Sequence, residues 1–178
     1  MEGVFTISLD FELHWGVFDK KDRDSRMTCY RNTLALIPEM LEFFTEYGVH
    51  VTWASVGGLF AEERAEWESL KPAVQPEYKN TTLSAYDYAI KNGLNSKYAE
   101  AHFAPKSIAA ILHYPGQELG THTFGHYYCL EPLTGAYAFD ADLKAARNAA
   151  KKFGQDPVSL VFPRNQFQTQ DLESCYAN

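Results

Sequence analysis

The chain has 178 residues, 46% of them hydrophobic and 22% charged, which fits one globular domain with a sizeable core and excludes a disordered chain. A net charge of −7, with no cluster of Lys and Arg, argues against a nucleic-acid partner. No apolar run approaches the ~20 residues that cross a bilayer, and the start, MEGVFTISLDFEL, lacks the basic region of a signal peptide. We therefore expect a cytoplasmic protein with no membrane partner.

The cysteines and aromatic residues add two weaker indications. Cys29, Cys129 and Cys175 are odd in number and show no CxxC spacing, which predicts free thiols in a reducing compartment. Aromatic residues reach 15% of the chain. Such rings line sugar grooves in some proteins, but for any single ring a place in the core is the commoner outcome.

The N-terminal part predicts a strand, a helix and a second strand. The β-branched, apolar residues 3–10 predict a buried strand, and the polar residues 17–30 predict a loop. Apolar residues at helical spacing predict a helix over 32–47, in which Pro38 marks either the start or a kink. Residues 49–55 predict the second strand.

The middle of the chain carries weaker signals. Residues 59–70 have a helical pattern before two prolines interrupt it, and residues 84–92 predict a short helix. Nothing between residues 59 and 104 places chemistry. We interpret 59–104 as an elaboration between the second and third strands.

The remainder returns to a regular alternation of helix and strand. The pattern predicts a helix over 105–113, a strand over 117–121, a helix over 139–153 and a strand over 157–162. Alternation of this kind predicts an α/β fold with a parallel sheet or barrel. Four strands are few for a closed barrel, which needs about eight, so we expect one incomplete domain over residues 1–178.

Two carboxylates follow the first predicted strand. Asp10 and Glu12 are two residues apart, so on a strand their side chains point the same way and can converge on one ion or one water. One can ligate a cation while the other stays free as a base. The alternative is an acidic strand end that is merely exposed to solvent.

Two histidines follow the third predicted strand. His122 and His126 belong to the segment HTFGH and share a face if the backbone there is helical. Two histidines and one carboxylate leave a coordination position open for water, which is the catalytic rather than the structural arrangement of zinc. An isolated HxxxH is a weak signal, and surface or core histidines are the alternative.

An arginine follows the fourth predicted strand, in the segment FPRN. Beside an acidic site, Arg164 can pair with Asp10 and keep it oriented and ionised, whereas an isolated surface arginine is the commoner case. In parallel α/β folds the functional site lies at the carboxyl ends of the strands. The acidic pair, the histidine pair and the arginine each lie at such an end, which favours a common site.

The segments SLDFE, YGVHVTWASVG, GQELGTHTFGH and VFPRNQ resemble, in this order, the polysaccharide deacetylase family, which is carbohydrate esterase family 4 or the NodB-homology domain. The resemblance covers residues 4 to about 167. It implies a deformed, TIM-like parallel (β/α) barrel. Two later family motifs, one with an aspartate and an aromatic wall and one with a general-acid histidine, are not visible, so we expect a domain truncated at the C-terminus.

The resemblance also implies roles for the metal centre. Asp10 matches the general base, and His122 and His126 match the two histidine ligands. The family's second aspartate, a metal ligand, falls on Phe11, so Glu12 is the substitute ligand. The bound ion is a divalent metal, with Zn²⁺ expected.

Further residues are expected around the metal. Thr123 matches the small hydroxyl residue between the histidines, and Arg164 resembles the arginine that orients the base, although FPRN departs from the family's RxPxG order. Trp15, with Gly16, is expected at the mouth of the site. Tyr127 and Tyr128 either stack on a sugar ring or pack in the core.

The resemblance implies a metal-dependent hydrolase that removes acetyl groups from N-acetylated or O-acetylated sugars in a polysaccharide or its precursor. The metal polarises the acetyl carbonyl, Asp10 takes a proton from water, and the oxyanion contacts the metal and a backbone N–H near Tyr127. Two alternatives remain open at this point. One is a related metal-dependent amidohydrolase acting on a non-sugar C–N bond, and the other is a non-catalytic member that binds a glycan or a protein partner.

Overall fold

The computed structural model describes residues 3–177 and contains a three-stranded parallel sheet in the order β1-β2-β3. The strands are β1 (Ser8–Phe11), β2 (Val51–Ser55) and β3 (Gln117–Thr121). Phe11 pairs with Ser55, which in turn pairs with Thr121, so all three strands end at the same edge of the sheet. The mixed α/β class is confirmed, and the described residues form an open sheet rather than a closed barrel.

Seven helices and five short 3₁₀ turns connect and cover the strands in the described part of the chain. The helices are α1 (Arg23–Glu46), α2 (Arg64–Leu70), α3 (Ala85–Asn92), α4 (Ala99–His102), α5 (Pro105–His113), α6 (Ala136–Lys151) and α7 (Thr169–Ala177). The turns are η1 (Leu13–Gly16), η2 (Gly57–Phe60), η3 (Thr81–Leu83), η4 (Ser96–Tyr98) and η5 (Pro163–Asn165). The expected helix over 139–153 is α6, displaced slightly towards the N-terminus.

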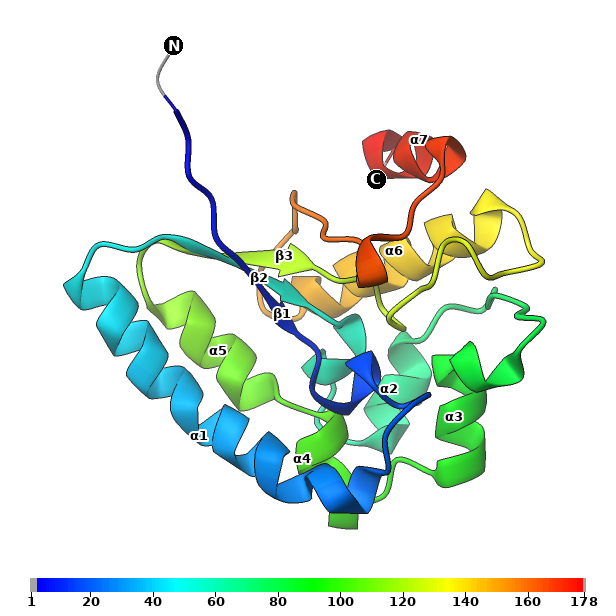
Figure 1. The fold of residues 1–178 in the computed structure, drawn as a ribbon, viewed down its shortest axis with the longest axis horizontal. Helices are drawn as coiled ribbons and strands as arrows, with labels where there is room; N and C mark the ends of the chain where they lie inside the picture. The colour runs from blue at the N-terminus through cyan, green and yellow to red at the C-terminus, as the bar shows by residue number, and fades with distance from the viewer. Residues whose placement is uncertain (1–2, 178) are drawn as a thin grey trace.

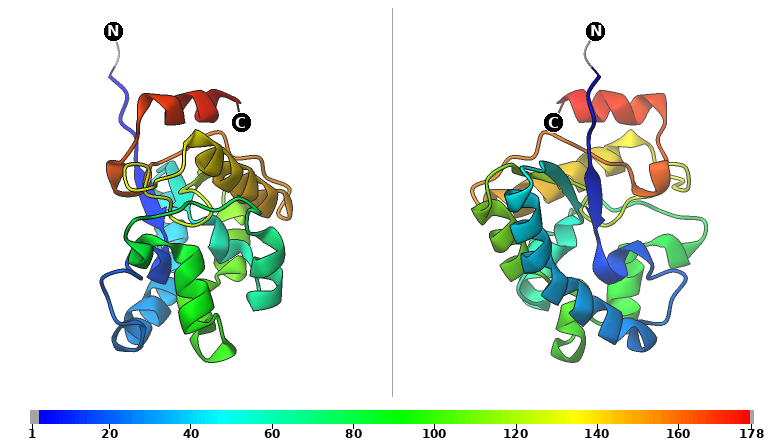
Figure 2. Two further views of the ribbon diagram at one scale, coloured as in Figure 1. Left: turned by 90° about the vertical axis from the view of Figure 1, so that its right-hand side faces the viewer. Right: turned by 60° about the vertical axis from the view of Figure 1, so that its left-hand side comes forward.

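The helices lie in two groups. Helices α1 and α5 lie side by side against the sheet (Figure 1), whereas α6 packs against η2 and α7 packs against α6 (Figure 2). Alternate strand residues such as Phe11, Trp53 and Leu119 belong to the main core, together with Leu41 of α1 and Ile108 of α5. This core fixes the strand ends that carry the candidate site.

The first helix begins well before the expected start at residue 32. Asp22 caps α1 by accepting a hydrogen bond from the Ser25 N–H at 2.9 Å, and the helix continues through Pro38. Met27 and Tyr30 are buried on the same stripe as the later apolar residues. The predicted loop is confirmed over 17–22 but was wrong over 23–30, because exposed charged residues hide these two core positions in the sequence.

The expected first and fourth strands are shorter than predicted. Strand β1 begins at Ser8, since its partner β2 begins at Val51 and leaves residues 3–6 nothing to pair with. Residues 157–162 run parallel to β3 but form a single bridge, between Leu160 and Thr121. Pro157 has no N–H to donate, and β3 ends at Thr121, so only a short pairing is possible.

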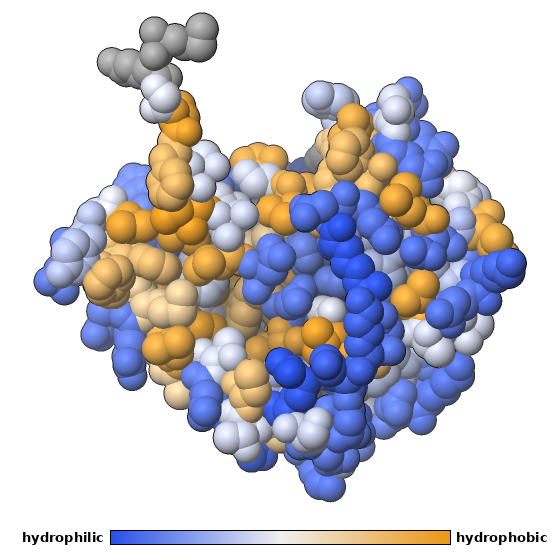
Figure 3. All heavy atoms as spheres, in the orientation of Figure 1, coloured by the Kyte–Doolittle hydropathy of each residue, from blue (hydrophilic) through white to orange (hydrophobic). Residues whose placement is uncertain are grey.

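The side of the sheet away from α1 and α5 is polar. Alternation along the strands places Asp10 and Glu118 there, and Glu118 accepts hydrogen bonds from the Thr52 and Ser159 hydroxyls. Apolar atoms gather where the N-terminal segment leaves the body (Figure 3), and Phe5 of that segment is exposed. All three cysteines are free. Among residues 3–177, no helix is both long and apolar enough to cross a membrane.

Candidate metal centre

Three side chains from two strand ends meet at one point. Glu12 follows β1, and His122 and His126 follow β3. One ligand atom from each lies within 4.8 Å of the others. The Glu12 Oε2 atom is 3.0 Å from His126 Nε2 and 3.5 Å from His122 Nε2. The structure thus brings together Glu12, His122 and His126, as expected from the sequence.

The position of Glu12 depends on a neighbouring glycine. A Cβ atom added at Gly16 would lie 1.9 Å from Glu12 Oε1, which is far inside any real contact distance. Turn η1 brings Gly16 back over Glu12, as the Trp15 N–H donates to the Glu12 carbonyl at 2.9 Å. The carboxylate therefore occupies the space that a side chain at residue 16 would fill.

The two histidines lie on a loop with left-handed residues rather than on the helix that their spacing suggested. Thr123 has a φ of 64° and His126 a φ of 54°. The Thr123 hydroxyl accepts a hydrogen bond from the Tyr127 N–H at 2.7 Å, which closes this histidine loop (residues 122–128) across His126. Thr123 therefore supports the backbone of the loop.

A buried aspartate on α6 anchors the histidine loop. Asp142 is 0% exposed and accepts hydrogen bonds from the Phe124 N–H at 2.5 Å and the Gly125 N–H at 3.2 Å. The Tyr86 hydroxyl of α3 donates to the same carboxylate at 2.6 Å. Burial raises the Asp142 pKa to about 6, although these hydrogen bonds oppose the rise. The anchor fixes a backbone that would otherwise have unpaired buried donors.

The end of β2 supports the same loop from another side. The N–H groups of Gly57 and Gly58 donate to the carbonyls of Thr123 and Phe124 at 2.8 and 3.0 Å. A Cβ at Gly57 would lie 2.8 Å from the Phe124 ring and 2.9 Å from its Cα. Glycine is required here because the two backbones approach too closely for a side chain.

The hydrogen bonding of His122 fits a bound cation. His122 Nδ1 donates to the Val161 carbonyl at 2.9 Å, because a carbonyl oxygen can only accept. In the neutral ring, Nε2 then carries a lone pair, is buried without a hydrogen-bond partner, and faces the Glu12 carboxylate. Two electron-rich atoms facing each other favour a cation between them, and the carbonyl holds the ring as metal-binding histidines are commonly held.

The electrostatics favour the metal-binding forms of Glu12 and His126. Burial raises the Glu12 pKa, but the neighbouring His122 and His126 rings outweigh it and lower the pKa to about 2. Burial lowers the pKa of His126, and Glu12 opposes that change. A carboxylate anion beside neutral imidazoles is the donor set of a catalytic Zn²⁺ centre.

Arg164 does not form the expected ion pair with Asp10, because it pairs with Asp19 instead. The Arg164 Nη2 atom donates to both carboxylate oxygens of Asp19, at 2.8 and 2.7 Å. Asp10 is exposed on β1, and in the described part of the chain it belongs to no group of metal-binding side chains. Arg164 reaches Asp19 because turn η5, where its φ is 54°, points it across the loop that follows η1.

Trp15, expected at the mouth of the site, and Tyr127 and Tyr128, for which sugar stacking or core packing was expected, are all buried. Trp15 is 1% exposed, stacks on Trp67 at 5.8 Å between ring centroids, and donates to the His102 carbonyl. Tyr127 is 3% exposed and packs against Phe139. Tyr128 is also fully buried, so none of the three rings offers a free face to a sugar.

Four residues that support the site were missed from the sequence. Each acts through a partner that is distant in the chain, which leaves no local pattern. They are Asp19, Tyr78, Tyr86 and Asp142. The segment 59–104, expected to place no chemistry, supplies two of them.

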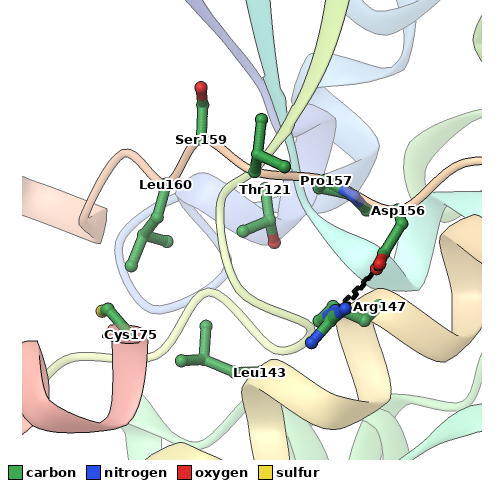
Figure 4. Close-up of a pocket in the computed structure, with 9 residues that line it drawn as sticks. Thr121, Leu143, Arg147, Asp156, Pro157, Ser159, Leu160 and Cys175 are labelled. Carbon is green, nitrogen blue, oxygen red and sulfur yellow. Dashed lines mark hydrogen bonds and ion pairs between the residues drawn. The ribbon is translucent and has the colours of Figure 1, made fainter. Parts of the chain in front are cut away.

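A separate pocket lies beside the centre. This cavity of about 240 Å³ lies between α6, α7 and residues 156–160 (Figure 4). The Arg147–Asp156 ion pair, at 2.5 Å, forms part of its wall. Its lining includes Thr121 but none of the three candidate ligands, so it is distinct from the metal centre.

The chain is an α/β protein with a glutamate and two histidines at the carboxyl edge of its parallel sheet, which is the arrangement of a candidate metal centre. No protein-family model matches the chain, and no curated protein matches it. Among solved structures, it is similar to the Streptococcus pyogenes deacetylase PplD in complex with acetate, with a TM-score of 0.54 and 10% identity. The match covers 97% of this chain and 51% of the other. The chain has a deacetylase-like fold and spans about half the length of that deacetylase.

Proposed function

We propose that this chain is a metal-dependent deacetylase of the polysaccharide deacetylase kind, acting on N-acetylated or O-acetylated sugars of a polysaccharide or its precursor. The observation that carries the proposal is the convergence of Glu12, His122 and His126 at a strand edge in a deacetylase-like fold. These three side chains would hold a divalent metal, with Zn²⁺ expected. When bound, that ion would supply Lewis-acid polarisation of the acetyl carbonyl and activation of water.

The protein's own groups divide the remaining work. Asp10 is proposed as the base that accepts a proton from water, which is supported by its exposure near the end of β1, two residues before Glu12. Arg164 is proposed to form the wall of the centre, because its guanidinium pairs with Asp19 and covers the Tyr128 ring. No general acid is assigned to the described residues.

The test is acetate release from N-acetylglucosamine oligomers by the zinc-loaded chain and its Asp10→Asn variant. We expect the variant to retain zinc and to lose at least ~100-fold in turnover, the usual contribution of a positioned base. Asp24→Asn, a change of the same kind at an exposed residue of α1, should affect neither. Loss of zinc in Asp10→Asn would make Asp10 a ligand, and a zinc-loaded chain without turnover would favour a glycan-binding role.

A further inference from the structure

A buried hydroxyl without a hydrogen-bond partner lies next to the candidate ligands. Tyr128 is 0% exposed, and its hydroxyl has no partner in the described part of the chain. Buried polar groups are nearly always hydrogen-bonded, because an unpaired one costs free energy. This hydroxyl therefore has the capacity to bind an atom from outside the protein.

Several contacts fix the Tyr128 ring beside the metal centre. Its plane is nearly perpendicular to the His126 ring, with the centroids 5.0 Å apart. The Arg164 guanidinium lies over the ring, 4.1 Å from its centroid. The Tyr128 N–H donates to the Tyr78 hydroxyl at 3.1 Å. The ring cannot swing away without breaking these contacts.

The histidine loop has few backbone donors left for a ligand. The N–H groups of residues 123–125 and 127–128 all donate to side-chain oxygens of the protein. An oxyanion contact from the Tyr127 or Tyr128 N–H would therefore have to compete with hydrogen bonds that these groups already donate within the protein. A side-chain donor can serve an acyl oxygen bound beside this loop, and among the described residues the buried Tyr128 hydroxyl has no hydrogen-bond partner.

We propose that the Tyr128 hydroxyl donates a hydrogen bond to the acyl oxygen of the ligand at this centre, either the acetyl carbonyl or an oxygen of the acetate product. The inference rests on the proposed function. A donor held in place before the reaction stabilises the carbonyl oxygen more strongly as negative charge develops on it. Tyr128 would thus act on the acyl group of the substrate rather than on its sugar rings.

The test uses cobalt(II) as the metal and acetate as the ligand, both followed by the visible absorption of the cobalt. Tyr128→Phe should bind cobalt as tightly as the wild type but acetate about tenfold more weakly, the usual effect of losing one hydrogen bond to a charged oxygen. Tyr127→Phe is the matched control. It removes the hydroxyl of the adjacent buried tyrosine, which packs in the core, and should leave both affinities unchanged.

Three outcomes separate this inference from the proposed function. The role of Tyr128 is overturned if the wild type and Tyr128→Phe bind acetate equally well, or if the cobalt-loaded wild type binds no acetate. Neither result contradicts the metal centre. Failure of the wild type to bind cobalt overturns the metal centre itself. Without metal, Tyr128→Phe should melt no lower than the wild type; a melting temperature several degrees lower would reveal a structural partner and contradict the inference.

Discussion

At the scale of single residues, the metal centre depends on the space left at Gly16. Gly16→Ala would place a Cβ against the Glu12 carboxylate and force it away from His122 and His126. We expect zinc affinity to fall by about tenfold or more, the range seen when a group that orients a ligand is changed. Competition with a chromophoric chelator measures this loss.

The matched control is Gly135→Ala. A Cβ at Gly135 would have its nearest neighbour 3.7 Å away, in the Tyr137 ring, which is an ordinary contact. This variant should bind zinc like the wild type. Zinc affinity unchanged in Gly16→Ala would mean that Glu12 is not a ligand, or that it reaches the metal by another conformation.

Some residues of the candidate site can be recognised from the sequence, whereas their partners in the fold cannot. The convergence of Glu12, His122 and His126 was predictable because their residue types suit a metal and each follows a predicted strand. The partner of Arg164 was not, because Asp19 lies 145 positions away and nothing local distinguishes it from Asp10. Residue types show what a site can bind, whereas pairings between distant residues depend on the tertiary structure.

At the scale of elements, Asp142 joins α6 to the histidine loop, and its burial predicts an unusual pH dependence. Its folded pKa of about 6 is above the ordinary 3.8, so the group favours the folded state below pH 4 and loses that contribution as the pH rises through 6. A shift of about two units corresponds to about 3 kcal/mol. Relative to Asp142→Asn, the wild type should lose about this much unfolding free energy between pH 4 and pH 7.

Urea unfolding at the two pH values measures this difference. Asp140→Asn is the control, since Asp140 lies on the same helix and pairs with Lys144 at the surface. Its difference from the wild type should change by less than about 0.5 kcal/mol between the two pH values. A constant difference for Asp142→Asn as well would show that Asp142 titrates as an ordinary carboxyl.

Elements with clear local boundaries were predicted well. Proline at the start of α5 and Pro115-Gly116 after it gave the bounds of α5 and β3 correctly. The start of α1 and the missing fourth strand were not predictable in this way. The first depends on two core residues within a charged segment, and the second on where β3 stops offering a partner.

At the scale of the whole molecule, a bound metal would link the ends of β1 and β3, which are adjacent to β2 but not to each other. Zinc should therefore stabilise the folded chain, by about 3 kcal/mol when it is present at 100 times its dissociation constant. Thermal unfolding with and without zinc measures this, and the rise should vanish in His126→Ala. A rise that persists in His126→Ala would place the zinc elsewhere.

The fold class was predicted from the sequence, but the closure of the sheet was not. The α/β class and the parallel strands followed from the alternation of elements along the chain. Barrel closure was an expectation from family resemblance, and the described residues supply three strands, whose order leaves one edge of β1 unpaired. Strand number and closure are properties of the assembled sheet that no single segment contains.

The central claim is that Glu12, His122 and His126 hold one metal ion. Its most direct test is elemental analysis of the chain after incubation with zinc and removal of unbound metal, beside His122→Ala and the control His113→Ala. We predict one equivalent of zinc in the wild type and in His113→Ala, whose exposed ring is outside the site, and none in His122→Ala. Zinc absent from the wild type, or retained in full by His122→Ala, would contradict the account.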